Sequence, residues 1–305
     1  MYRNLIVNIL ILSISTFCLF SCADKKNKQK GIDIAETYGD ETLTEYETSK
    51  KEFDNVFKTK DLALAEKWLA KKMENDTVYL LSNTQVVSIL LQDLIELNTA
   101  TMDYPFTLLK DNGFLNIVTS TDSNLKIYAW NDGTGNYNGG FHHIIQYKSK
   151  GKIYNISYES AYCLECEQDE DYDCRGFELY TMQLNDKTYY LVECSYMKAA
   201  GWLSNRDISI YTIEHNKLVK QTLFKTSKEL LSEIGFEYDA ASYYDDFVKG
   251  NEDSDSFDWV FGYDDRYKII YIPLVDNLTV TDKNLLYQWD GKYFTYIGIE
   301  KGRRK

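Results

Sequence analysis

The chain has 305 residues, of which 44% are apolar and 27% charged, and its formal net charge at pH 7 is -13. This composition excludes an intrinsically disordered polymer, and the length suits one large domain or two small ones. The excess of acidic residues argues against nucleic-acid binding, because contacts with phosphates require a basic face.

The first residues have the pattern of an export signal. A positive charge at Arg3 precedes an apolar run from Leu5 to Phe20, which is short for a membrane span and typical of a signal-peptide core. The run closes with Leu19, Ser21 and Cys22. This ending resembles the lipobox of bacterial lipoproteins, which has a Leu three residues before a Cys and a small residue directly before it.

The lipobox resemblance implies that residues 1–21 are removed and that Cys22 becomes an acylated N-terminus held on a lipid bilayer. The alternative is an ordinary cleaved signal peptide in which Cys22 is incidental. Ala23 rather than Asp follows the cysteine, which by the same resemblance favours the outer membrane. The leaflet, periplasmic or surface, stays open. Residues 22–47 have few large apolar side chains, so we expect a flexible tether.

The segment 48–110 is expected to be helical. Apolar residues recur at three- and four-residue steps from Ser49 to Met73, with a break at which Thr59 or Asp61 would cap a second helix. A further amphipathic run covers 84–97. The N-terminal part of the folded protein is therefore predicted to consist of short helices.

From 111 to 305 the pattern changes to short aromatic and β-branched runs separated by turn residues, which predicts antiparallel hairpins. The clearest turn is Asp290–Gly291, because Asp-Gly between two aromatic runs is typical of a type I′ turn. The six predicted hairpins are 115–119 with 125–130, 141–147 with 152–158, 177–184 with 188–196, 207–213 with 218–224, 257–263 with 267–272, and 285–289 with 292–297.

These hairpins group into three units, near 114–158, 177–224 and 257–299, each with the four strands of a propeller blade. Propellers typically have four blades or more. We therefore expect a mainly β fold of the α+β class: an antiparallel hairpin meander that forms a sheet or sandwich, or a propeller-like arrangement, with the N-terminal helices packed on it. The stretch 227–248 is predicted to be one more helix and a loop.

Four cysteines remain after removal of the signal segment, and an even number in an oxidising compartment predicts two disulfides. We prefer the pairs Cys166–Cys174 and Cys163–Cys194, and the other two connectivities stay open. A four-thiolate zinc site needs two close ligand pairs, and only one is present. The Cys-x-x-Cys spacing of 163 and 166 also fits a redox pair, but the surrounding sequence lacks the βαβ pattern that usually holds one.

The acidic loop between these cysteines offers oxygen ligands at Asp169, Asp171 and Asp173. This spacing begins like a calcium loop, but Gly176 comes eighth instead of sixth and Tyr180 stands twelfth instead of Glu. We expect a solvated acidic loop, with weak calcium binding as the alternative. No other cofactor is predicted.

The loop from Asp132 to Gly140 is the most unusual segment of the chain. Its glycines permit positive φ and a close approach of the backbone, as in loops that bind phosphates or sugars. A flexible connection between hairpins is the alternative. Because neighbouring residues of a strand point to opposite faces, His142 and His143 are not expected to line one site. The candidate ligand contacts are Trp130, Asp132, Gly133, Gly135 and His142.

The sequence contains no nucleophile elbow, no zinc-protease helix and no phosphate-binding P-loop, so no catalytic residue is assigned. The hairpins are similar to those of Tyr-rich lipoproteins of Gram-negative envelopes, a resemblance that implies no activity. The 26 Tyr favour a binding or interaction module, in which aromatic rings stack on a glycan or an envelope protein. A hydrolase with an Asp/Glu pair and a scaffold of an envelope assembly are the alternative hypotheses.

Overall fold

The computed structural model describes residues 40–74, 82–132, 140–159, 176–197, 203–239 and 261–301. The chain divides into two compact units between Leu90 and Leu91, inside a helix. Within the described residues, no helix has both the length and the apolar character that crossing a membrane requires.

The first unit contains helices α2 (Asp40–Phe57) and α3 (Leu62–Glu74) and the first half of α4 (Ser82–Leu97). As predicted, Asp61 caps α3: its Oδ1 accepts hydrogen bonds from the backbone N–H groups of Ala63 (3.0 Å) and Leu64 (3.1 Å). Such a side-chain acceptor satisfies N–H groups that the helix itself leaves unpaired.

Helix α2 starts at Asp40, inside the segment 22–47 that was predicted to be a tether, so that prediction is wrong for its last residues. The helix extends this far because its first turns have partners. Tyr46 is only 6% exposed, and Glu45 forms an ion pair with Lys72 of α3. Further along α2, Phe53 packs its ring against Trp68, with the ring centroids 5.3 Å apart.

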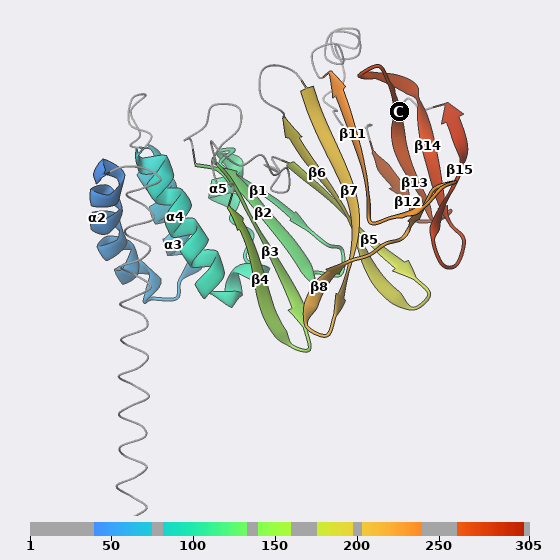
Figure 1. Ribbon diagram of the computed structural model, residues 1–305. Helices are drawn as coiled ribbons and strands as arrows, with labels where there is room; N and C mark the ends of the chain where they lie inside the picture. Colours follow the sequence, from blue (N-terminus) through green and yellow to red (C-terminus); the bar gives the residue numbers. More distant parts are fainter. Residues whose placement is uncertain are drawn as a thin grey trace, which may run out of the picture. The chain divides into compact units, whose positions relative to one another are not determined.

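The second unit holds the end of α4, two short helices and three sheets, as Figure 1 shows. The short helices are η1 (Thr99–Asp103) and α5 (Thr107–Asp111). Sheet A is an antiparallel meander of β1 (Leu115–Thr119), β2 (Leu125–Asn131), β3 (Phe141–Ser149) and β4 (Lys152–Glu159).

Sheet B has the strand order β11-β7-β6-β5, with β8 paired to β7. Its strands are β5 (Gly176–Leu184), β6 (Lys187–Met197), β7 (Leu203–Glu214), β8 (Lys217–Lys220) and β11 (Glu233–Asp239). Sheet C has the order β10-β9-β15-β14-β13-β12. Its strands are β9 (Phe224–Lys225), β10 (Leu230–Leu231), β12 (Gly262–Asp264), β13 (Ile269–Asp276), β14 (Thr279–Trp289) and β15 (Phe294–Lys301).

The predicted hairpins are confirmed as antiparallel pairs β1–β2, β3–β4, β5–β6, β7–β8, β12–β13 and β14–β15. Two of them differ in extent. The fourth ends at Lys220, and Phe224 belongs to β9 of sheet C, where it pairs in parallel with Phe294. In the fifth, residues 257–260 lie outside the described part of the chain.

The prediction of a type I′ turn at Asp290–Gly291 is wrong. Four residues, 290–293, separate β14 from β15, and of the Asp-Gly pair only Gly291 has a positive φ (99°). The Asp290 carboxylate organises the loop by accepting hydrogen bonds from the backbone N–H groups of Lys292 and Tyr293. Two-residue connections with positive φ at both positions, the signature of type I′ turns, occur at 150–151, 185–186, 215–216 and 277–278.

The helix expected over 227–248 is also wrong where the structure describes this stretch, because β10 and β11 occupy it. In β11 the apolar residues Ile234 and Phe236 alternate with polar ones, which is the two-residue period of a strand. Both pack against the core between sheets B and C. Residues 240–248 lie outside the described part of the chain.

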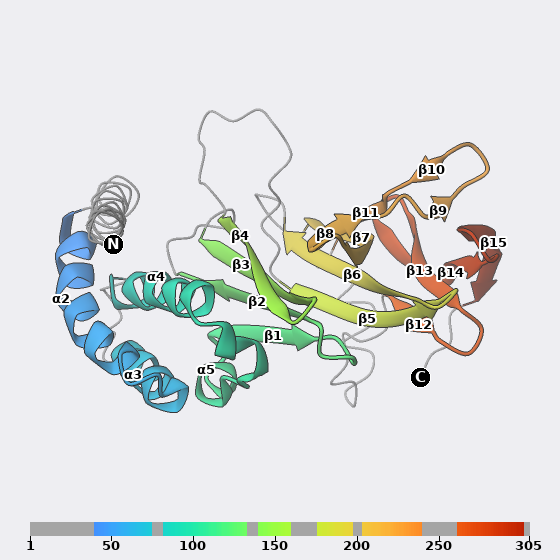
Figure 2. The same ribbon diagram turned by 90° about the horizontal axis from the view of Figure 1, so that it is seen from below.

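The three sheets of the second unit lie in layers, with sheet B between sheets A and C (Figure 2). One apolar core joins sheets A and B through Leu125, Ile127 and Ile145 on one side and Tyr190 and Val192 on the other. A larger core joins sheets B and C and contains Met182, Leu184, Leu191, Ile208, Ile210, Phe224, Phe261, Ile270, Ile272, Tyr287 and Phe294. The predicted mainly β fold of the α+β class, built from antiparallel hairpins, is confirmed.

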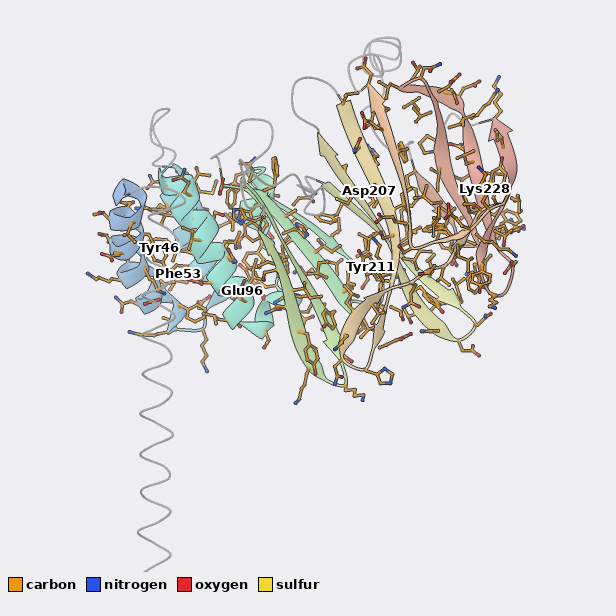
Figure 3. The ribbon with its side chains drawn as sticks, viewed as in Figure 1. Tyr46, Phe53, Glu96, Asp207, Tyr211 and Lys228 are labelled. Atoms are coloured by element: carbon orange, nitrogen blue, oxygen red, sulfur yellow. The ribbon has the colours of Figure 1, made fainter. Side chains whose placement is uncertain are left out.

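The end of α4 packs on the outer face of sheet A, which is the face that points away from sheet B. The side chain of Gln146 in β3 donates a hydrogen bond to the backbone oxygen of Ile95 (3.0 Å). In β4, Asn155 donates to the backbone oxygen of Glu96 (2.9 Å) and Ser157 to its carboxylate (2.6 Å). Figure 3 marks Glu96 at this end of the helix. The expected packing of a helical element on the sheet is confirmed for this segment.

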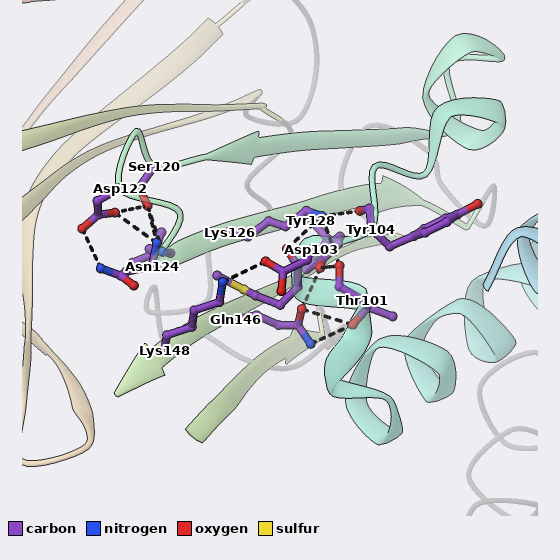
Figure 4. Close-up of polar contacts among 12 residues, drawn as sticks. Thr101, Asp103, Tyr104, Ser120, Asp122, Asn124, Lys126, Tyr128, Gln146 and Lys148 are labelled. Carbon is purple, nitrogen blue, oxygen red and sulfur yellow. Dashed lines mark hydrogen bonds and ion pairs between the residues drawn. The ribbon is translucent and has the colours of Figure 1, made fainter. Parts of the chain in front are cut away.

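A buried lysine fixes η1 to the same face of sheet A (Figure 4). Lys126 is 3% exposed, and its ammonium donates to the backbone oxygens of Thr101 (3.1 Å), Met102 (3.4 Å) and Tyr104. Burial lowers the pKa of Lys126 to about 8, so the amine is still mainly protonated at neutral pH. Three carbonyl oxygens therefore replace the water that the buried ammonium has lost.

Replacing Lys126 with Met should lower the free energy of unfolding by about 2–4 kcal/mol, because the change strands buried carbonyl groups without a donor. Lys148→Met is the matched control, since Lys148 pairs with the largely exposed Asp103 and its loss should cost less than about 1 kcal/mol. Urea titrations followed by tryptophan fluorescence measure both values. Equal losses in the two variants would show that the buried lysine does not fix η1.

Candidate functional site

The described residues include only part of the predicted site residues. Trp130, Asp132, His142 and Cys194 lie among the described residues. Cys194 lies half-buried on β6, opposite Asp207 of β7. The remaining candidates lie outside the described residues, and the predictions about them stay predictions: Cys22, Gly133, Gly135, Cys163, Cys166, Asp169, Asp171, Asp173 and Cys174.

Trp130, Asp132 and His142 come together at one end of sheet A, and we call them the His142 site. Trp130 in β2 is directly opposite His142 in β3, and their rings are stacked, with centroids 5.5 Å apart and an angle of 8° between the planes. Asp132 follows the last residue of β2. Its Oδ2 lies 3.0 Å from Nε2 of His142.

The backbone holds Asp132 in this position. Its N–H donates to the backbone oxygen of Gly140 (2.7 Å), which closes the loop at the base of the two strands. The imidazole of His142 is thus fixed through its face by Trp130 and through one edge by Asp132. Packing on one side and a hydrogen bond on another leave the ring a single orientation.

All three side chains of the His142 site are buried. Trp130 is 3% exposed, Asp132 1% and His142 7%. Trp130 therefore stacks on His142, and its ring does not stack on a ligand as an exposed ring would. Its contribution is to orient the imidazole.

The second ring nitrogen of His142 is the unusual feature of the site. Nδ1 is buried, and among the described residues it has no hydrogen-bond partner. A buried polar atom without a partner costs about 1–3 kcal/mol. Atoms of this kind are rare in folded proteins and call for an explanation such as an ordered water or a ligand.

The carboxylate of Asp132 determines what Nδ1 does. An ionised carboxylate is only an acceptor, so Nε2 carries the hydrogen that lies between them. In the neutral imidazole the other nitrogen is then an acceptor. With the imidazole in this neutral form, the His142 site presents a buried, oriented acceptor for a hydroxyl or N–H group.

His143 lies on the opposite face of β3, as the alternation of strand residues predicts. Its ring contacts Phe177 of sheet B, with the centroids 5.3 Å apart. Burial, with a smaller effect of His142, lowers the pKa of His143 from its ordinary value of 6.5 to about 4. His143 is therefore a neutral core residue and not part of the His142 site.

A second group of polar residues, which the sequence did not predict, lies on the face of sheet B that points toward sheet C; Glu193 is buried, and Glu178 and Arg206 are half-buried. Glu178 and Glu193 are directly opposite each other in β5 and β6, and Arg206 in β7 pairs with Glu193. The only signal in the sequence was a charged residue at an inward position of each strand. Within the described residues, no three potential metal ligands of the His, Cys, Asp and Glu types meet.

Comparisons with protein-family models, with curated proteins and with solved structures find no match to this chain. The function must therefore be inferred from the geometry of its sites.

Because the pKa of His143 is lowered in the folded protein, the folded state should lose stability in acid. An unfolded chain binds a proton at this side chain below pH 6.5, whereas the folded protein does so only near pH 4, so stability is present above 6.5 and is lost as the pH falls. Between pH 7 and pH 4.5 the loss should be about 2–3 kcal/mol.

His143→Phe should remove this component, so that the variant loses about 2–3 kcal/mol less than the wild type over the same interval. Urea unfolding at the two pH values measures the difference. His215→Phe is the control, because His215 lies exposed in the β7–β8 turn and its replacement should leave the wild-type pH dependence unchanged. Identical pH dependence in wild type and His143→Phe would contradict the prediction.

Proposed function

We propose that the chain is a membrane-anchored envelope lipoprotein that binds a hydroxyl-bearing ligand, a glycan, at the His142 site. The single observation that carries the proposed ligand site is the buried Nδ1 of His142, an acceptor without a partner among the described residues. A carbohydrate hydroxyl is a strong donor of suitable size, and burial of the acceptor makes the hydrogen bond stronger than it would be in water.

The surroundings of the His142 site support a ligand of this kind. Asp132 holds the imidazole with Nδ1 as the acceptor, and Trp130 keeps the ring from turning. The loop that begins at Asp132 contains four glycines, whose lack of side chains allows a ligand to approach the backbone closely. Recognition would thus combine a fixed histidine with a glycine-rich loop.

The proposed location rests on the sequence. The lipobox-like segment ending at Cys22 supports acylation and attachment to a bilayer, with the outer membrane favoured by Ala23. Export would place the protein in an oxidising compartment, which supports two disulfides among Cys163, Cys166, Cys174 and Cys194.

Attachment is tested by growing expressing cells with radiolabelled palmitate. The wild-type chain should incorporate the label and fractionate with membranes, whereas Cys22→Ser should do neither, because only this cysteine ends the lipobox-like segment. Cys18→Ser is the matched control and should behave as the wild type, since Cys18 lies in the segment that is removed. An unlabelled wild-type chain in the soluble fraction would refute the proposed anchor.

Ligand binding is tested with the detergent-solubilised mature chain on a glycan array and with soluble muropeptides. Asp132→Asn is the informative variant, because the amide of Asn can donate to Nε2, so that the hydrogen moves to Nδ1 and the acceptor becomes a donor. Binding should weaken about tenfold or more, as expected for loss of a buried hydrogen bond. His215→Gln should bind as the wild type.

Nitrogen-15 NMR provides an independent readout of the same variant. The chain has three His, so each ring can be assigned from single substitutions. In the wild type, the neutral His142 ring should carry its hydrogen on Nε2, and in Asp132→Asn on Nδ1. Retained glycan binding after this tautomer change, or no binding by the wild type at millimolar ligand, would overturn the proposed function.

A further inference from the structure

The face of sheet B that points toward sheet C ends in a patch of polar side chains. We call the residues Glu178, Glu193, Arg206 and Tyr238 the Glu193 cluster. They come from four adjacent strands, β5, β6, β7 and β11. The register brings them together. Glu178 is opposite Glu193, and Arg206 is opposite Phe236, which lies two residues before Tyr238 on the same face of β11.

The contacts of the Glu193 cluster are specific. Arg206 donates through Nη1 to Oε1 of Glu193 and through Nε to the hydroxyl of Tyr238 (3.3 Å). Its guanidinium carbon lies 5.9 Å from the centre of the Tyr238 ring. Tyr180 donates its hydroxyl to Oε2 of Glu178 (3.0 Å). One oxygen of each carboxylate therefore has a partner.

The second oxygen of Glu193 has none. Glu193 is 1% exposed, and its Oε2 lacks a hydrogen-bond partner among the described residues. Burial raises the pKa of Glu193 above its ordinary value; Arg206 opposes the rise and Glu178 adds to it. The carboxylate is thus short of stabilising partners even with the arginine in place.

Charge within the cluster is unbalanced. When both acids are ionised, Glu178 and Glu193 carry one negative charge more than Arg206 compensates. A hydroxyl ligand could satisfy Oε2 but would leave this charge uncompensated, and charges in a low-dielectric site are costly unless they are paired. A ligand with one positive charge satisfies both requirements.

Aromatic rings border the cluster. The ring of Tyr180 lies next to that of Tyr263 in sheet C, with centroids 6.4 Å apart and an angle of 67° between the planes. Ring faces attract organic cations, most strongly in sites from which water is excluded. Carboxylates together with tyrosine rings are suited to an alkylammonium group, whose head can be hydrogen-bonded while its methylene groups pack on the rings.

We propose that the Glu193 cluster is a binding site for a small primary amine, whose ammonium group donates to Oε2 of Glu193 and is stabilised by Glu178. Arg206 holds Glu193 in place through the other oxygen, and Tyr180 orients Glu178. This site is independent of the His142 site, which lies in sheet A.

The test is calorimetric titration of the detergent-solubilised mature chain with butylamine, and with butanol as the uncharged analogue of the same shape. Butylamine should bind saturably with one site per chain, and butanol should not bind at the same concentrations. Absence of saturable butylamine binding at millimolar concentration, or equal binding of butanol, would overturn the proposal.

Variants locate the site. Glu193→Gln keeps an oxygen for Arg206 but removes the charge, so butylamine binding should weaken roughly tenfold or more, the loss expected for one charge-assisted hydrogen bond. Glu178→Gln, at a less buried position, should weaken binding in the same direction and remains informative if Glu193→Gln fails to fold. The control is Glu214→Gln, which removes one partner of the surface pair with Lys187 and should change nothing.

Two further outcomes are decisive. Unchanged affinity in both folded cluster variants would overturn the proposal. Asp132→Asn should bind butylamine as the wild type, and a loss of affinity there would place the amine at the His142 site and overturn the assignment to the Glu193 cluster. Failure of glycan binding with intact amine binding would leave this inference standing while removing the proposed function.

Discussion

The second unit depends on the burial of both faces of sheet B. Successive residues of its strands point to opposite sides, so that Tyr190 and Val192 pack toward sheet A while Leu191 packs toward sheet C. Polar side chains in the middle of such a strand lie between two sheets, whereas residues near the strand ends, such as Gln183, remain exposed. The second face of sheet A contacts the end of α4 and η1.

This constraint makes every buried polar group in the sheets informative. On the outer face of sheet A, the side chains of Lys126, Tyr128 and Gln146 donate hydrogen bonds to backbone oxygens of η1 and α4. These contacts hold η1 and the end of α4 on the sheet. His142 and Glu193 differ, because each has a buried side-chain atom without a partner among the described residues. Oδ1 of Asn155 also lacks a partner among the described residues, so the roles proposed for His142 and Glu193 rest on the groups around them.

The two proposed sites have complementary chemistry. At the His142 site we propose that a single ring nitrogen, in an imidazole oriented by Asp132 and Trp130, accepts a hydrogen bond from an uncharged hydroxyl. The Glu193 cluster offers an excess of negative charge beside tyrosine rings, which suits a cation. Because they lie on different sheets, one protein could recognise two kinds of chemical group independently, as expected of a binding module better than of an enzyme with a single centre.

The sequence by itself determined the hairpins, since local alternation and turn residues specify which neighbouring strands pair, and it limited the cap of α3 to Thr59 or Asp61. It indicated the loop after Trp130 and the candidates Asp132 and His142, because these are close in the chain. It did not show β11, whose short alternation was mistaken for a helix, or the Glu193 cluster. Only the tertiary structure decided those features, because the order of the strands in sheet B and its burial between two other sheets arise from contacts between residues far apart in the chain.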